Sequence, residues 1–206
     1  MRIAVIGTGH VGGALGTGWA RAGHDVIFGA RDPEGSNAQL LPAKVAGKTR
    51  LMSLADAVAS AEVVVLAVPG PAVADALREI SAGLPGKILI DCTNPGVGPS
   101  AGSGGERVAR LAPGAKVVKA FNTTGFENME NPQYGNGSVT MFYAGDDADS
   151  KRVVHGLAKD LGFDPVDAGG LSQARALEML ASFWGALAYG QKMGRGIAFR
   201  LLRRDS

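Results

Sequence analysis

A glycine-rich segment near the N-terminus restricts the fold of this chain more than any other feature of its sequence. Its residues Gly7, Thr8, Gly9, His10, Val11 and Gly12 match the pattern G-x-G-x-x-G. The segment follows an apolar run, Arg2–Ile6, which is typical of a buried strand, and it opens a stretch with helical spacing, His10–Ala22. In this context the pattern indicates a dinucleotide-binding βαβ unit.

Each glycine of the segment meets a different requirement of such a unit. Gly7 permits the tight turn, Gly9 lets a pyrophosphate approach the backbone, and Gly12 lets the helix pack close to the strand. The N–H groups at the start of the helix then bind the phosphates. Thr8 and His10 carry side chains that can donate to phosphate or ribose oxygens. We therefore expect this segment to bind a dinucleotide.

The remainder of the chain alternates short apolar runs with stretches of helical spacing. Strands are expected at Asp25–Phe28, Glu62–Val68, Lys87–Asp91, Lys116–Ala120, Val139–Ala144 and Phe163–Val166. Helices are expected at Leu54–Ser60, Pro71–Ser81 and Asp147–Leu161, and from Ser172 to Arg204 as one long helix or two helices broken near Gly190–Gly194. This alternation predicts an α/β fold, a doubly wound (Rossmann), mainly parallel sheet with helices on both faces. We expect a single domain over residues 1–206, in which residues 172–206 form a C-terminal helical extension.

Composition excludes several other classes of protein. The net charge of +2 is too small to indicate nucleic acid or a membrane surface as a partner. No apolar run is long enough to span a membrane, and the single cysteine, Cys92, excludes an internal disulfide framework. These features predict a cytoplasmic protein. The stretch Gly96–Gly105 is expected to be a surface loop near the ligand crevice, with a lid as the alternative.

The end of the second predicted strand distinguishes NADP from NAD. NAD-specific folds place an acidic residue there to accept from the ribose 2′-OH. Here Ala30 takes that place and Arg31 follows, and a guanidinium can bind a 2′-phosphate in bidentate fashion. The alternative is that Asp32, displaced by two residues, binds the ribose of NAD. We expect NADP(H).

Three further strand ends should border the nicotinamide half of the cofactor. Val68 ends one strand and Pro69 follows it, Asn94 follows another strand, and Ala120 ends a third, with Asn122 two residues beyond. Phe121 lies between the last two and is expected in the core rather than as a stacking platform. No cluster has metal-ligand spacing, and no nucleophile elbow or Tyr-x-x-x-Lys pair is present. Hydride transfer between two rings needs orientation more than a proton donor, so these absences favour a ring-shaped redox acceptor.

With these residues, the sequence resembles the family of NADPH-dependent reductases of the deazaflavin coenzyme F420. It also resembles the cytosolic reductase domain of the STEAP metalloreductases. The shared motifs are GTGHVGGALG, GHDVIFGARDP, AVPG, DCTNPG, VVKAFNTTG and the later AGDD, so the resemblance covers nearly the whole chain.

The resemblance implies hydride transfer between NADPH and F420 or a flavin-like ring. Thr8, Ala30 and Arg31 would bind the adenosine phosphate, while Val68, Pro69, Asn94, Ala120 and Asn122 would border the reacting rings. Related proteins are commonly dimers, so a homodimer is expected. Two departures concern the family pattern: Ala30 stands where better-known members often have Ser, and Thr123–Gly135 does not match them closely.

Two other functions remain open from the sequence. One is an NADPH-dependent reductase of a small carbonyl or imine substrate, and the other is a non-catalytic NADP(H)-binding redox sensor. Near the C-terminus, Arg195, Arg200, Arg203 and Arg204 are expected to interact with a helix dipole. The alternative is that they bind an anionic substrate tail or phosphate.

Overall fold

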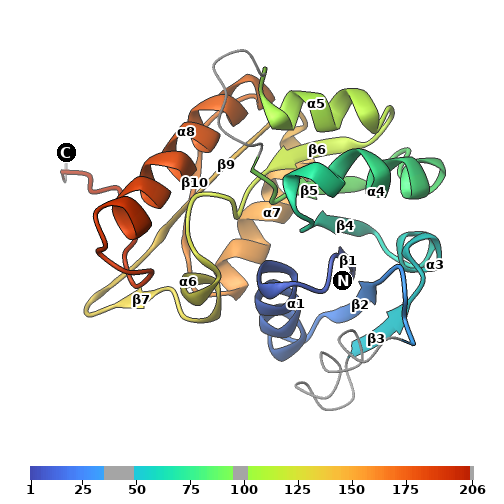
Figure 1. Cartoon of the computed structure of the whole chain (residues 1–206), viewed down its shortest axis with the longest axis horizontal. Helices are drawn as coiled ribbons and strands as arrows, with labels where there is room; N and C mark the ends of the chain where they lie inside the picture. The colour runs from blue at the N-terminus through green and yellow to red at the C-terminus, as the bar shows by residue number, and fades with distance from the viewer. Residues whose placement is uncertain (35–48, 95–101, 205–206) are drawn as a thin grey trace.

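The computed structural model describes residues 1–34, 49–94 and 102–204, where an eight-stranded sheet has helices on both faces (Figure 1). The strands of this sheet are β1 (Arg2–Ile6), β2 (Asp25–Gly29), β3 (Thr49–Met52), β4 (Val63–Leu66), β5 (Ile88–Asp91), β6 (Lys116–Lys119), β9 (Thr140–Gly145) and β10 (Asp164–Asp167). The helices are α1 (His10–Arg21), α3 (Leu54–Ala59), α4 (Val73–Ile80), α5 (Gly104–Leu111), α6 (Phe126–Glu130), α7 (Ala148–Asp160) and α8 (Ala174–Gly185). A separate two-stranded ribbon joins β7 (Gln133–Tyr134) and β8 (Gly137–Ser138).

The strand order identifies where a ligand binds. The sheet runs β10-β9-β6-β5-β4-β1-β2-β3, and the strands from β3 to β6 are all parallel. From β1 the chain moves outward to β2 and β3, then returns to β4 on the other side of β1. The crevice outside the carboxyl ends of β1 and β4 is therefore the topological switch point at which such sheets bind ligands. This is the predicted doubly wound fold.

Alternation along the strands explains why both faces are covered. In β1, Ile3 and Val5 belong to a core cluster that includes residues of α1 and α7, while Ala4 and Ile6 belong to a second cluster with α3 and α4. All four side chains are fully buried. Successive side chains of a strand point to opposite faces, so a continuous apolar run requires a helical layer on each side.

One end of the sheet departs from the parallel arrangement. β9 pairs with β6 in antiparallel orientation, and β10 is parallel to β9. Four elements were not predicted from the sequence: β3, α5, α6 and the β7–β8 ribbon. They are short, and several are only partly buried, so their apolar periodicity is weak.

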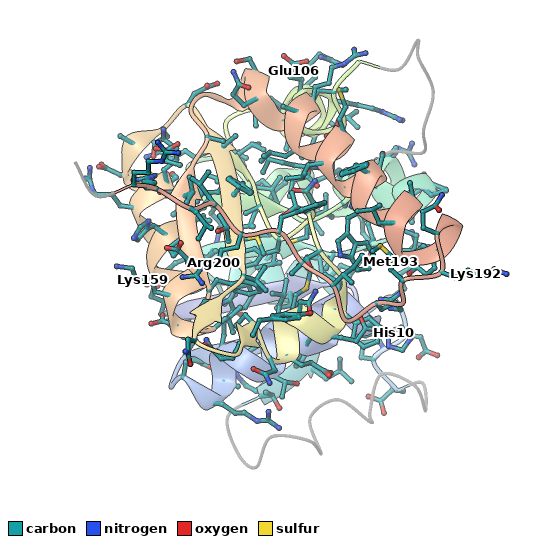
Figure 2. The ribbon with its side chains drawn as sticks, turned by 90° about the vertical axis from the view of Figure 1, so that its left-hand side faces the viewer. His10, Glu106, Lys159, Lys192, Met193 and Arg200 are labelled. Atoms are coloured by element: carbon teal, nitrogen blue, oxygen red, sulfur yellow. The ribbon has the colours of Figure 1, made fainter. Side chains whose placement is uncertain are left out.

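The C-terminal region is helical only in its first part. After α8 a π-helical turn covers Ala186–Gly190, and residues 191–204 contain no helix, so the expected helix as far as Arg204 is wrong. Lys192 and Gly194 both adopt positive φ, at 57° and 79°, which ends the helix. Beyond them the backbone pairs with other elements: Thr140 donates to the carbonyl of Phe199 at 3.1 Å. Figure 2 shows this segment crossing the molecule from Met193 past Arg200.

The expected surface loop at Gly96–Gly105 lies partly outside the described residues. Its last two residues, Gly104 and Gly105, instead begin α5, because Ser103 caps that helix by accepting from the amide of Glu106. The lid remains untested. Among the residues that the structure describes, no helix is long and apolar enough to cross a membrane.

Candidate functional site at the carboxyl ends of the central strands

The glycine segment forms a close turn from β1 into α1, packed against the end of β4. Gly7 has a φ of +113°, and a Cβ there would lie 2.4 Å from the carbonyl oxygen of Ala67, just after β4. A Cβ on Gly12 would lie 2.0 Å from the carbonyl oxygen of Gly7. By contrast, a Cβ on Gly9 would meet no described atom within 4 Å. The backbone at Gly9 is thus open to a ligand, whereas Gly7 and Gly12 are required for packing.

The start of α1 presents backbone donors to this open side. Gly9 is the N-cap residue, it makes no side-chain cap, and the first turn carries no acidic residue. The first N–H groups of a helix have no intrahelical partners, and the dipole there favours an anion. The described residues therefore fit the pyrophosphate of a dinucleotide.

The end of β2 carries the residues expected to select the cofactor. Ala30 is buried, and its amide donates to the carbonyl of Met52 at 3.1 Å. Arg31 and Asp32 follow it, and both are exposed. Both remain candidates for contact with the 2′ position of the ribose.

β4 ends at Leu66, two residues earlier than predicted. Val68 and Pro69 therefore lie in the turn that follows the strand. Val68 contributes to the crevice wall, since its Cγ1 would lie 3.2 Å from a Cβ on Gly7. Pro69 is exposed and precedes the short 3₁₀ turn Gly70–Ala72.

The ends of β5 and β6 meet through two asparagine side chains. The Nδ2 of Asn122 donates to Oδ1 of Asn94 at 3.0 Å, and the Nδ2 of Asn94 donates to the backbone carbonyl of Asn122 at 2.9 Å. The Oδ1 of Asn122 is buried and has no partner within the described structure. A buried acceptor without a donor is costly, so this atom fits the carboxamide N–H of a nicotinamide.

Phe121 sets the direction of Asn122. It adopts a φ of +58°, which is rare for a residue with a Cβ, and its side chain is fully buried. Its ring packs edge-on against Trp19 and Phe163, with centroids 5.5 and 6.2 Å away. The expected core position of Phe121 is confirmed. Ala120, just before it, is fully buried at the end of β6.

A cluster of rings and charges next to the glycine segment could not be expected from the sequence. His10 stacks on Phe126 of α6, with centroids 4.5 Å apart. The guanidinium of Arg195 lies 4.8 Å from the Phe126 centroid, and it donates to Glu127 and to the hydroxyl of Tyr189. This Arg195 cluster ties the C-terminal segment to α6 and, through Phe126, to His10. Its members come from separate parts of the chain, so no local motif reveals it.

The cluster corrects the expected role of Arg195. The residue lies five positions beyond the last helical turn and pairs with a carboxylate instead of a helix end. Burial, the largest single influence, would raise the pKa of Glu127, but the hydrogen bond and charge of Arg195 and a backbone hydrogen bond together keep this pKa below its ordinary value. The same bond raises the pKa of Arg195. Arg200, Arg203 and Arg204 likewise lie in the non-helical segment.

Other chemistries find little support in the part of the chain that the structure describes. No group of three or more His, Cys, Asp or Glu residues there could hold a metal ion. Cys92 is buried, and burial raises the pKa of its thiol far above the ordinary value, so it is not a thiolate nucleophile.

Comparisons with known proteins connect this site to a family. A model of the family "NADP oxidoreductase coenzyme F420-dependent" matches residues 2–95. The F420-dependent NADP reductase of Methanothermobacter thermautotrophicus is 35% identical over 203 residues, covering 87% of this chain and 86% of the relative. The chain belongs to the family of F420-dependent NADP reductases. The family resemblance read from the sequence is therefore confirmed.

One solved structure supports this family, and other similar proteins share part of their length or only the fold with this chain. A structure from Arthrobacter sp. FB24, assigned as an F420-dependent NADP reductase, has a TM-score of 0.89 and 35% identity and covers 98% of this chain and 100% of that one. The metalloreductase STEAP3 of Rattus norvegicus is 31% identical over 183 residues, but the chain spans only 36% of its length. A reductive aminase from Aspergillus terreus shares the fold, with a TM-score of 0.69 at 20% identity.

Proposed function

We propose that this F420-reductase family member transfers a hydride between NADPH and coenzyme F420. The observation that carries the proposal is the 35% identity to an F420-dependent NADP reductase along most of both chains. The nicotinamide of NADPH supplies the hydride when the cofactor is bound. The residues of the crevice hold that ring in place for the transfer.

We assign the adenosine end of the cofactor to one side of the switch point. The amides that follow Gly9 bind the pyrophosphate, with Thr8, His10 and Val11 completing the turn. Arg31 binds the 2′-phosphate, because a guanidinium offers two parallel donors to phosphate oxygens. Ala30 provides a small, buried floor beneath it.

We assign the nicotinamide end to the other side. The Oδ1 of Asn122 accepts from the carboxamide, and Asn94 fixes the orientation of the Asn122 amide. Val68, Pro69 and Ala120 border the ring. Amide side chains orient a ring but act neither as acids nor as bases near neutral pH, which suits direct hydride transfer between two rings.

The test is an anaerobic assay with NADPH and F420, followed by the absorbance of F420, with FMN and FAD as alternative acceptors. We expect F420 reduction that depends on NADPH and falls in Asn122→Ala. Turnover of a flavin but not of F420 would change the assigned hydride acceptor from F420 to a flavin. Tight NADPH binding without turnover of any ring acceptor would overturn the proposal and favour a carbonyl or imine reductase, or a redox sensor.

Two broader properties belong to the same proposal. We infer a cytoplasmic protein, consistent with one cysteine and a cofactor of central metabolism. We also infer a homodimer that uses the exposed apolar side chains of α8, among them Met179 and Phe183, which are 65% and 55% exposed. Sedimentation of the purified chain tests the dimer, and a monomer at micromolar concentration would contradict it.

A further inference from the structure

Three charged side chains are buried together just below the crevice. Lys119 and Asp91 are fully buried, and the Glu178 side chain is 9% exposed. The Nζ of Lys119 lies 2.9 Å from Oδ2 of Asp91 and 3.2 Å from Oε1 of Glu178. We call these three residues the ionic cluster. They join β6, β5 and α8 at one point.

Every charge in the ionic cluster has further hydrogen-bond partners. The Oδ1 of Asp91 accepts from the amide and hydroxyl of Thr93 at 2.9 and 2.7 Å. Glu178 accepts from the amides of Gly104 and Gly105, at 3.1 and 2.9 Å, and from the Ser103 hydroxyl at 3.5 Å. These amides belong to the first turn of α5, whose dipole offsets the second carboxylate.

The close contact between α5 and α8 depends on a glycine. A Cβ on Gly105 would lie 2.7 Å from the Cβ of Ala174, at the start of α8. Glu178, one turn further along α8, is thereby brought onto the end of α5. The C-terminal region is thus connected to the central strands and is not a loose extension of the sheet.

The ionic cluster stands in a regular relation to the two asparagines. Asp91 and Lys119 are register partners on neighbouring parallel strands. Three residues beyond each of them come Asn94 and Asn122, which are hydrogen-bonded to one another. Lys119 also donates to the backbone carbonyl of Thr93, the peptide unit that leads into Asn94. The ion pair therefore fixes the same two chain segments that carry the amide pair.

We propose that Lys119, held by Asp91 and Glu178, is a positioning residue for the nicotinamide half of the cofactor. Lys119 acts through the Thr93 carbonyl and the Asn94–Asn122 pair. This positioning role rests on the proposed function of that pair. Three buried charges stabilise a core no better, in many cases, than apolar residues of similar volume. The three charges instead fix the relative position of the two strand ends, which is a reason to retain them.

The experiment compares two ligands that share the adenosine end. NADP⁺ reaches both sides of the crevice, whereas 2′,5′-ADP reaches only the adenosine side. The variants are Lys119→Met, which removes the charge at similar length, and the milder Glu178→Gln, which keeps the shape. Lys116→Met is the matched control: Lys116 is on the same strand and also pairs with a carboxylate, Asp147 at 3.4 Å, but it lies at the opposite end and is 44% exposed.

NADP⁺ affinity should fall about tenfold in Glu178→Gln, and further in Lys119→Met, while 2′,5′-ADP affinity stays unchanged. Lys116→Met should change neither. Equal losses for both ligands, or unchanged NADP⁺ affinity, would overturn the positioning role. If Lys119→Met does not fold, Glu178→Gln decides. Failure of the wild-type chain to bind NADP⁺ would overturn the proposed function itself, and the positioning role with it.

Discussion

The side chain of Asn122 donates to Oδ1 of Asn94 at 3.0 Å, and Asn94 donates back to the backbone carbonyl of Asn122 at 2.9 Å. These two hydrogen bonds connect the segments that follow the neighbouring strands β5 and β6. It leaves one buried acceptor, Oδ1 of Asn122, directed to no protein donor among the described residues. Asn122 directly follows the left-handed turn at Phe121.

Replacing Phe121 by Ala should impair both stability and cofactor binding. Loss of a fully buried ring costs about 3–5 kcal/mol of unfolding free energy, and the chain at Asn122 loses its anchor. Phe163→Ala is the control, because its ring packs in the same core cluster but it is not a chain neighbour of Asn122. Denaturant unfolding should show similar losses for both variants. The KM for NADPH should rise only in Phe121→Ala; an equal rise in Phe163→Ala would contradict a local role.

Arg31 should decide between the two nicotinamide cofactors. Arg31→Ala removes a charge-assisted contact worth about 1.5–3 kcal/mol, so NADPH affinity should fall by roughly ten- to a hundredfold while NADH affinity changes little. Asp32→Asn is the neighbouring control and should leave NADPH binding intact. Titration by fluorescence measures both. Weaker NADH binding in Asp32→Asn, with NADPH binding unaffected in Arg31→Ala, would assign the ribose contact to Asp32.

Two glycines of the turn should respond differently to alanine. Gly9→Ala meets no described atom within 4 Å, so the Tm without cofactor should not change, but the added methyl blocks the pyrophosphate. NADPH affinity should fall about tenfold or more, which is about 1.4 kcal/mol. Gly12→Ala brings its Cβ to 2.0 Å from a backbone oxygen and should lower Tm as well. A stable Gly12→Ala with normal binding would contradict this geometry.

The pair of Glu127 and Arg195 should stabilise the fold in a pH-dependent way. The pKa of Glu127 is lowered below its ordinary value of 4.5, so its contribution to stability is complete above that pH and is lost as the pH falls through the folded-state pKa. The difference in Tm between wild type and Glu127→Gln should therefore shrink below pH 4.5. Arg195→Gln should reproduce this loss, since it removes the donor. A difference in Tm that stays constant down to acid pH would show that the pair is not responsible.

Local sequence patterns were sufficient to predict the first strand, the glycine turn and the residues that follow the second strand. The bounds of β1 are those predicted, because a buried strand of a parallel sheet is a continuous apolar run. The glycine turn could be placed because each of its requirements is met within six residues. Arg31 after β2 could be singled out for the same reason: sequence neighbours of a strand end stay near it in any fold of this class.

Tertiary structure alone decided what distant residues do together. Asn94 and Asn122 were expected at the same crevice, but no local pattern predicts the hydrogen bonds that join them across 28 positions. Nor does any local pattern bring Glu127 and Arg195 together across 68 positions. The segment after Gly190 has helical apolar spacing in part, yet its backbone pairs with β9 and with Trp184 instead. Helix propensity contributes only tenths of a kcal/mol per residue. Long-range hydrogen bonds and packing therefore override it.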